Sequence, residues 1–206
     1  MPYKSAQHEG FTLVELIMVV TIMVLMAGAM IPSFTSYLKS QTLKQAQERV
    51  KSDLRSIQNK ALTGALYDKT VDVAGTPQSV THWGVRFTTN SPTYSYFIAY
   101  ATTGGQFTSE CNNFNAGQGN GNSRRLQGTG TLPSDMVFKS ASGCLFFDFK
   151  NGTTRPVLAG FTSPLYFGYT ASSATGNCRN IRFNWAGSIF NTNADQCSCA
   201  NPATCQ

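Results

Sequence analysis

Histidine is scarce in this 206-residue chain, which has two, and His82 is the only one after residue 10. His82 lies in a predicted strand beside Trp83, where a structural role is the ordinary explanation for a lone histidine. The sequence also lacks a paired-carboxylate motif and a nucleophile elbow. Gly119-x-Gly121 neither follows a strand nor opens a helix, as a dinucleotide-binding loop would. We therefore expect no enzymatic centre, no cofactor and no metal site.

Cysteine is absent from the first 110 residues, and all six cysteines lie beyond them. An even number of cysteines confined to one region is typical of disulfides formed in an oxidising compartment. Six cysteines allow 15 pairings, so the sequence assigns none. A metal site at Cys197-x-Cys199 and Cys205 is the alternative, but it lacks the paired C-x2-C spacing and a nearby histidine. The disulfide candidates are Cys111, Cys144, Cys178, Cys197, Cys199 and Cys205.

Charge is nearly absent from residues 11–31, where Glu15 is the only charged side chain. A run of about 20 apolar residues is long enough to cross the hydrocarbon core of a bilayer as one helix. A carboxylate inside such a span costs at least ~2.5 kcal/mol of insertion free energy unless it has a partner. Either the span begins a turn later and leaves Glu15 at the interface, or Glu15 has a functional partner.

The segment Gly10-Phe11-Thr12-Leu13-Val14-Glu15 closely resembles the processing site of the type IV pilin and type II secretion pseudopilin family. The resemblance implies that a prepilin peptidase cuts between Gly10 and Phe11 and methylates the new amino terminus of Phe11. It also implies that the Phe11 ammonium of one subunit meets Glu15 of its neighbour and sets their axial register. Such a pair is strong only where it is desolvated and aligned.

A cleavable secretory signal is the main alternative, because Ala27-Gly28-Ala29 imitates a small-residue cleavage site and would leave a chain that begins at Met30. Against it stand the charge of Glu15 inside the apolar run and the helical pattern that continues without a break. Six basic residues follow the run, so the positive-inside rule alone places the rest of the chain in the cytoplasm. The cysteines and the pilin-type leader place it outside, in the periplasm or beyond, and this is our expectation.

Helical patterning resumes directly after Pro32, which ends the apolar run and removes one hydrogen bond from the preceding turn. Apolar residues then recur every three or four positions and leave a charged outer face, which we expect to be solvated. The pattern predicts one helix over residues 11 to about 62, with Gly64 as its stop signal. The predicted apolar stripe consists of Leu43, Ala46, Val50, Leu54, Ile57 and Ala61.

Beyond residue 65 the pattern favours strands. Segments 80–87 and 94–100 are predicted to pair around a turn at 89–92, and the turns Asn151-Gly152 and Ala186-Gly187 favour antiparallel pairing. Further strands are predicted at 136–139, 144–149, 165–170, 180–184 and 188–190. The fold class is α+β, with a long N-terminal helix packed on a mostly antiparallel sheet domain. The predicted divisions are a leader (1–10), a transmembrane or filament-core half-helix (11–31), an amphipathic half-helix (32–64) and a β domain (65–206).

Three further segments are similar to the minor subunits typified by the H-type pseudopilin and the FimT and FimU minor pilins: Trp83-Gly84-Val85-Arg86-Phe87, Leu132-Pro133-Ser134 and Ile181-Arg182-Phe183-Asn184-Trp185-Ala186-Gly187-Ser188-Ile189. The resemblance implies a pilin fold and a structural subunit of a type IV pilus or a type II secretion pseudopilus. Its implied partners are other pilins or pseudopilins, the prepilin peptidase and the inner-membrane assembly platform. Its implied location is the inner membrane and then the filament.

DNA binding is the alternative function, because FimT-like minor pilins include DNA-uptake receptors. The glycine- and asparagine-rich segment 117–125 is predicted to be a mobile surface loop, and it carries Arg124 and Arg125. Arginine offers a planar fork of donors to a phosphate. No aromatic residue interleaves with these arginines to stack on bases, so the structural role is favoured.

Overall fold

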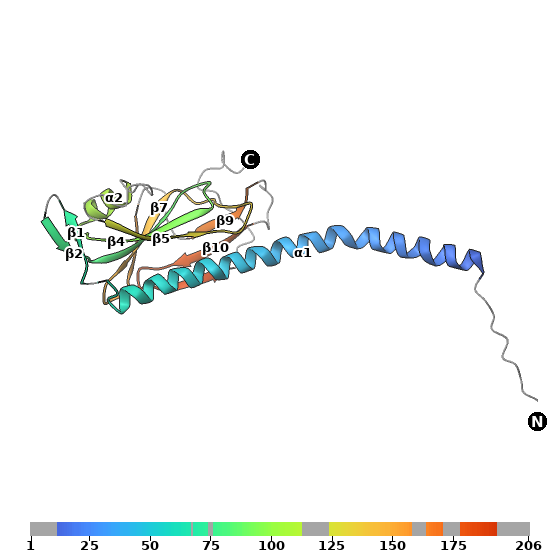
Figure 1. The fold of residues 1–206 in the computed structure, drawn as a ribbon, viewed down its shortest axis with the longest axis horizontal. Coiled ribbons are helices and arrows are strands. Elements are labelled where there is room, and N and C mark those ends of the chain that lie inside the picture. Colours follow the sequence, from blue (N-terminus) through green and yellow to red (C-terminus); the bar gives the residue numbers. More distant parts are fainter. Residues whose placement is uncertain are drawn as a thin grey trace, which may run out of the picture. The chain divides into compact units, whose positions relative to one another are not determined.

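The structure is a computed structural model of the chain (Figure 1), and it describes residues 12–66, 68–73, 76–112, 124–157, 164–170 and 178–192. Within these ranges, the side chains of residues 29–33, 73, 124 and 192 also lie outside the description. The chain divides into two compact units, Met1–Lys39 and Ser40–Gln206. The second unit combines helices with antiparallel sheets, so the α+β prediction is confirmed.

One helix, α1 (Leu13–Leu62), forms the regular structure of the described part of the first unit and continues into the second. Its backbone stays helical through Pro32. At its end, the Gly64 amide donates to the Ala61 carbonyl (3.1 Å) and the Ala65 amide to the Lys60 carbonyl (2.8 Å). Gly64 has a φ of 68°, which glycine adopts without steric cost, and the two bonds form a Schellman cap. The predicted end of the helix is confirmed.

The second half of α1 buries a single stripe. All six residues predicted for this stripe are at most 3% exposed. They belong to one core cluster with side chains from the two large sheets. Burying a Val- or Leu-sized side chain stabilises a fold by about 1.5–3 kcal/mol, so this stripe is a major part of the core. Its members are Leu43, Ala46, Val50, Leu54, Ile57 and Ala61.

A five-stranded antiparallel sheet forms one side of this core, in the order β5-β4-β3-β7-β8. Its centre is the predicted hairpin, in which His82 pairs with Ala99 and Phe87 pairs with Tyr94. The turn between them passes through Asn90, whose φ is 59°. The strands are β3 (His82–Phe87), β4 (Thr93–Ala99), β5 (Arg124–Thr131), β7 (Gly143–Asp148) and β8 (Thr154–Val157).

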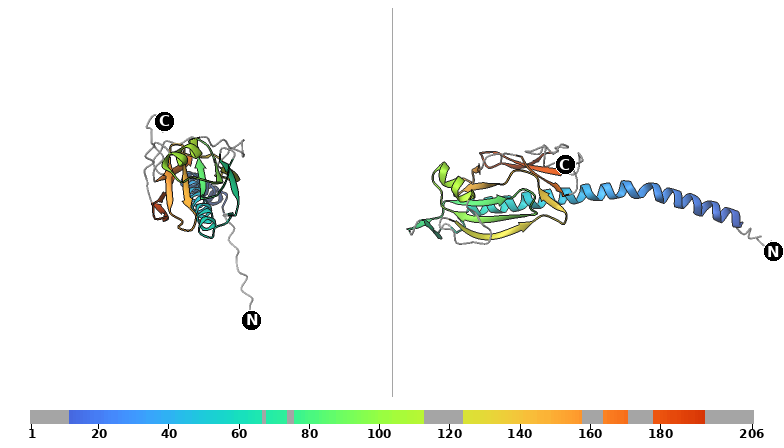
Figure 2. Two further views of the ribbon diagram at one scale, coloured as in Figure 1. Left: turned by 90° about the vertical axis from the view of Figure 1, so that its left-hand side faces the viewer. Right: turned by 90° about the horizontal axis from the view of Figure 1, so that it is seen from above.

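A four-stranded antiparallel sheet, in the order β11-β10-β9-β6, forms the other side of the core. Figure 2 shows the two sheets on opposite sides of the second half of α1. All four strands of this sheet match predicted segments. They are β6 (Met136–Phe138), β9 (Leu165–Tyr169), β10 (Cys178–Phe183) and β11 (Ile189–Thr192), and a separate small hairpin is formed by β1 (Thr70–Val73) and β2 (Thr76–Ser79).

The outer face of the five-stranded sheet carries a second core cluster, covered by the short helix α2 (Gly104–Asn112). We call it the outer cluster, and its members are Phe97, Ala99, Ala101, Phe107, Cys111, Cys144, Phe146 and Val157. Phe107 of α2 packs on Phe146 of β7, with ring centroids 5.0 Å apart. A disulfide between Cys111 and Cys144 ties the same helix to the same strand. Gly84 is required beneath this cluster, because a methyl group there would overlap the Phe97 ring.

The sequence prediction is wrong for the start of β5. Arg124 and Arg125, which were expected in a loop, pair in strand register with Ala99 and Ile98. Two other glycines lie within this strand, where they make room for aromatic rings. A side chain at Gly128 or Gly130 would overlap the tyrosine rings of β4, and a glycine in a strand commonly marks such a close approach.

Several predicted features lie outside the described residues. These are Gly10, Phe11 and the side chain of Pro32, together with residues 117–123 and the three cysteines Cys197, Cys199 and Cys205. Cys178 takes part in a disulfide, and the pairing lies outside the description as well. Among the residues that are described, no helix combines the length and the hydropathy of a membrane span.

The Cys111–Cys144 bridge gives a stability prediction. It spans 33 residues, and in the loop-entropy account its removal lowers the free energy of unfolding by about 4 kcal/mol. We expect a double variant, Cys111→Ser with Cys144→Ser, to show this loss in urea unfolding followed by circular dichroism. A mild detergent keeps the chain in solution. Thr108→Ala on the same helix is the matched control and should change little. An unchanged unfolding midpoint in the double variant would contradict the prediction.

Candidate functional site

The first turn of α1 is closed by two side chains that bond reciprocally. The Thr12 amide and the Thr12 hydroxyl both donate to Oε2 of Glu15, each at 3.1 Å. The Glu15 amide donates back to the Thr12 hydroxyl oxygen at 3.3 Å. This is a capping box, which satisfies amide groups that a helix start otherwise leaves unbonded. Glu15 is therefore also a helix cap, a role that sequence reasoning missed although the spacing Thr-x-x-Glu before an apolar run signals it.

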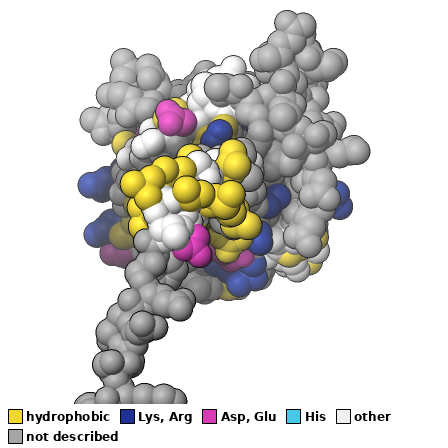
Figure 3. All heavy atoms as spheres, turned by 90° about the vertical axis from the view of Figure 1, so that its right-hand side faces the viewer, with side chains coloured by type: hydrophobic (Ala, Val, Ile, Leu, Met, Phe, Trp, Pro, Cys, Tyr) yellow, Lys and Arg dark blue, Asp and Glu magenta, His cyan; other side chains and the backbone are white. Residues whose placement is uncertain are grey.

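The surface that follows the cap is apolar on every side. Between Leu13 and Met26 only Glu15 and Thr21 are polar, and twelve large apolar side chains are each 51–74% exposed. Figure 3 shows hydrophobic side chains gathered around the end of the helix that faces the viewer. These side chains are Leu13, Val14, Leu16, Ile17, Met18, Val19, Val20, Ile22, Met23, Val24, Leu25 and Met26, and we call them the apolar sleeve.

Thr21 does not interrupt the apolar sleeve with a free polar group. Its hydroxyl lies 3.0 Å from the Ile17 carbonyl and 2.8 Å from the Met18 carbonyl, within the same helix. A threonine that bonds back to its own helix leaves its methyl group for contact with the surroundings. Further along the same unit Phe34 and Tyr37 are also exposed, by 61% and 59%. The described part of the first unit thus has far more apolar surface than it buries.

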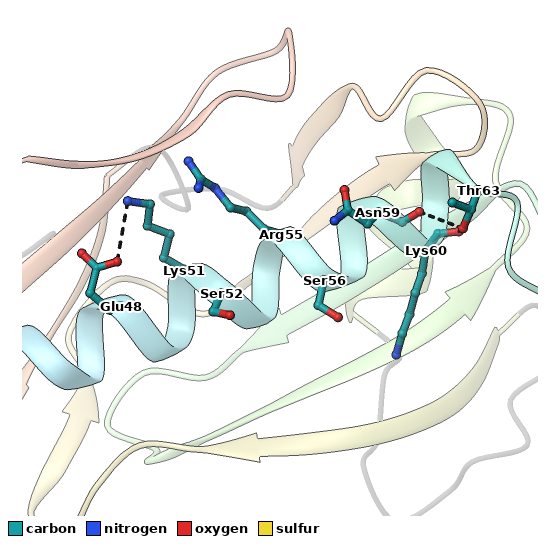
Figure 4. A pocket seen from close by; sticks show the side chains of 8 residues that line it. All are labelled: Glu48, Lys51, Ser52, Arg55, Ser56, Asn59, Lys60 and Thr63. Atoms are coloured by element: carbon teal, nitrogen blue, oxygen red, sulfur yellow. Dashed lines mark hydrogen bonds and ion pairs between the residues drawn. The ribbon is translucent and has the colours of Figure 1, made fainter.

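The outer face of the second half of α1 carries a polar groove (Figure 4). Lys51 lies 3.7 Å from the carboxylate of Glu48, and Arg55 donates to a backbone carbonyl at the start of β11 at 3.2 Å. Lys60 lies over two aromatic rings of the five-stranded sheet, 5.4 and 5.6 Å from their centroids. In Figure 4, Lys51 and Arg55 extend to one side of the helix and Lys60 to the other. These cations therefore bind within the fold and do not form one joint surface for a polyanion.

The residues proposed for DNA contact are not arranged as a loop. Arg125 is exposed on β5, the edge strand of the five-stranded sheet beside β4. The side chain of Arg124 lies outside the description. The structure therefore places the exposed Arg125 on a strand and not in the predicted loop.

His82, the histidine weighed for catalysis, is packed into the outer cluster. Its ring meets Phe107 edge-on at 4.6 Å, and its Nδ1 lies 2.8 Å from the Thr81 hydroxyl. Burial lowers the pKa of His82 to about 4, against the raising influence of Asp148 and with a smaller lowering influence of Arg155. The imidazole is therefore neutral at neutral pH. These contacts give it a packing role.

The lowered pKa of His82 makes stability depend on pH. The unfolded chain binds a proton near the ordinary histidine pKa of about 6.5, whereas the folded chain does so only near 4. Stability is therefore complete above about pH 6.5 and falls by about 3 kcal/mol as the pH drops to 4. We measure the free energy of unfolding in urea at about pH 7 and at about pH 4. In His82→Gln we expect the decrease between these two pH values to be about 3 kcal/mol smaller than in the wild type. His8 is present in both proteins and contributes equally to each decrease. An equal decrease in the free energy of unfolding in both proteins would therefore contradict the prediction.

Comparison with known proteins provides no relative. No model of a protein family, no curated protein and no solved structure matches the chain. A functional assignment therefore depends on the motifs of the sequence and on the geometry described above.

Proposed function

We propose that the chain is a minor pilin or pseudopilin, a structural subunit that inserts through α1 into a type IV pilus or a type II secretion pseudopilus and helps its assembly. The observation that carries the proposal is the apolar sleeve. A helix that is apolar on all sides is normally buried on all sides, in a bundle or a membrane. The second half of α1, with its single stripe, needs only its own domain.

The size of the apolar sleeve supports burial by several neighbours. Twelve large side chains stay more than half exposed, and burying each fully is worth about 1.5–3 kcal/mol. One neighbouring helix covers only one face, so lipid or a bundle of like helices is needed to cover the whole circumference. In the proposed route the segment 11–31 lies in the inner membrane first and in the filament core afterwards.

The capping box adds a reason for the placement of Glu15. Both hydrogen bonds from Thr12 end on Oε2, which fixes the direction of the carboxylate. Among the described residues, Oε1 has no hydrogen bond or ion pair. In the proposed filament this oxygen accepts from the methylated Phe11 ammonium of the adjacent subunit. A charge pair inside an apolar bundle penalises misaligned neighbours strongly, so it sets register.

The disulfide between Cys111 and Cys144 supports a location of the β domain outside the cytoplasm. Reducing compartments keep thiols free, whereas periplasmic and surface domains keep such bridges. The DNA-binding alternative has no comparable support, because Lys51, Arg55 and Lys60 of α1 contact groups within the fold and Arg125 lies on a strand. We therefore propose the assembly role alone.

The roles of Glu15 as cap and as charge can be separated. Glutamine also serves at this position of a capping box, so Glu15→Gln keeps the cap and removes the charge. Thr12→Ala keeps the charge and removes the two cap bonds that use the Thr12 hydroxyl. We expect Glu15→Gln to be processed normally but to enter filaments about tenfold less than the wild type, measured by immunoblot of sheared filaments. Thr12→Ala should enter nearly normally. Filament levels of Glu15→Gln equal to the wild type would refute the register role.

The processing site gives an independent prediction. Amino-terminal sequencing and mass spectrometry of the mature protein should find a chain that begins with methylated Phe11. Gly10→Glu should leave the precursor uncleaved in the membrane fraction, because the peptidase must fit the residue before the cut. A mature chain that begins at Met30 would show that the apolar segment is a discarded signal, and the filament proposal would fail.

A further inference from the structure

The side chain of Trp185, in the second unit, is exposed to solvent. Its side chain is 66% exposed, whereas Trp83, the only other tryptophan of the chain, is 2% exposed. Leaving an indole in water forgoes the stabilisation that burial of a large aromatic side chain gives. Exposed tryptophans are also enriched among residues that dominate binding energy. The surroundings of Trp185 are therefore a candidate binding site.

The turn that carries Trp185, between β10 and β11, is closed by three hydrogen bonds. The Asn184 amide donates to the Ser188 carbonyl at 3.2 Å, and the Ser188 amide donates to Oδ1 of Asn184 at 2.9 Å. The Gly187 amide donates to the Asn184 carbonyl at 3.0 Å. Gly187 has a φ of 88°, which a residue with a side chain adopts only with strain. The backbone under the indole is thus fixed locally.

The same turn is also tied to two other elements. The Gln58 side chain of α1 donates to the Gly187 carbonyl at 2.7 Å and to the Gly152 carbonyl at 3.0 Å. The Thr154 amide of β8 donates to the Trp185 carbonyl at 3.2 Å. A side chain whose support is ordered in advance loses less entropy when a ligand arrives. The exposed indole is therefore a preorganised contact.

A small pocket of about 200 Å³ lies beside this indole and contains two opposite charges. The Oδ1 atom of Asp148 lies 3.7 Å from Nε2 of His82, beyond hydrogen-bond distance. The guanidinium of Arg155 lies over the Phe107 ring, 4.6 Å from its centroid. Among the described residues the Arg155 guanidinium has no hydrogen bond, so its N–H groups can donate to other partners. The lining residues are His82, Asp148, Thr153, Thr154, Arg155 and Trp185.

The pocket's chemistry selects a ligand without net charge. One carboxylate and one guanidinium balance each other, so a ligand of either charge meets one repulsive group. A hydroxyl group can donate to the carboxylate and accept from the guanidinium. A sugar ring combines several hydroxyls with an apolar face of C–H groups that can pack on an indole. We propose that this pocket binds a neutral sugar residue of a glycan, with Trp185 against the ring and Asp148 and Arg155 at adjacent hydroxyls.

This binding site is independent of filament assembly, because the pocket lies wholly in the second unit and contains no residue of the apolar sleeve. Glu15→Gln, which is expected to impair incorporation, should bind sugar as the wild type does. Failure of sugar binding with intact assembly would remove this inference alone, and the reverse result would remove only the assembly proposal.

The test uses the full chain in a detergent without a sugar headgroup and follows the indole N–H signals by nuclear magnetic resonance. The two tryptophans give two signals. The probes are the methyl glycosides of glucose, galactose, mannose and N-acetylglucosamine, titrated into the millimolar range that suits a site for one sugar residue. We expect at least one probe to shift the Trp185 signal with saturation. The Trp83 signal, whose N–H bonds to the Ala65 carbonyl at 3.1 Å, should stay in place.

Variants distinguish a specific pocket from a general effect. Asp148→Asn, followed by the Trp185 indole signal, and Trp185→Ala, followed by the backbone amide signals of the other pocket residues, should each weaken binding about tenfold or more. An otherwise unchanged amide spectrum checks that each variant is folded. Phe190→Ala, at an exposed aromatic residue on β11, is the matched control and should leave the affinity unchanged. The proposal is overturned if no probe shifts Trp185 or if Asp148→Asn binds as the wild type does. It is also overturned if free lysine or glutamate saturates the site and no sugar does.

Discussion

The structure of the second unit depends on one stripe of α1. Six small and aliphatic side chains, which include Leu43, Val50 and Leu54, fill the space between the two sheets and join both in one core. Polar side chains beside the stripe fix how the helix sits. Gln47 donates to a carbonyl of β10 at 2.6 Å, and Asp53 accepts from the Tyr94 hydroxyl of β4. Burial and this bond raise the pKa of Tyr94 above its ordinary value, so the hydroxyl keeps the proton that it donates to Asp53 at neutral and mildly alkaline pH. Without the helix, neither sheet has a complete core.

The two halves of the same helix therefore need different partners to bury their apolar side chains. The half in the second unit is amphipathic, and its own domain satisfies it. The half in the first unit is apolar all round and has only Glu15 and Thr21 as polar side chains between Leu13 and Met26, both bonded locally. No fold of this chain can bury such a sleeve against a domain of ordinary size from one side. Covering the apolar sleeve on all sides takes lipid or several neighbouring helices. This requirement supports the proposed assembly role.

Periodic parts of the structure could be predicted from the sequence, and parts made by distant residues could not. The stripe of α1, its end at Gly64 and the β3–β4 hairpin follow from local spacing, so they were found. The start of β5 was missed because the glycine- and asparagine-rich segment 117–125 favoured a loop, whereas the pairing of Arg124 and Arg125 with β4 depends on residues distant in the sequence. The capping box was overlooked because the charge of Glu15 suggested a partner in another subunit. The pocket beside Trp185 was missed because residues 82, 148, 155 and 185 meet only after three strands and a turn are assembled.

The outer cluster links the disulfide to this pocket. A helix of nine residues is marginal on its own, so α2 needs both the Cys111–Cys144 bridge and the packing of Phe107 to stay on the sheet. Phe107 in turn supports the two groups at the pocket's rim, since His82 packs on its edge and Arg155 lies over its face. Loss of α2 would leave the guanidinium of Arg155 without its aromatic support and would expose His82 to water. The disulfide therefore supports the pocket indirectly, because it holds α2 and so keeps the Phe107 ring in contact with His82 and Arg155.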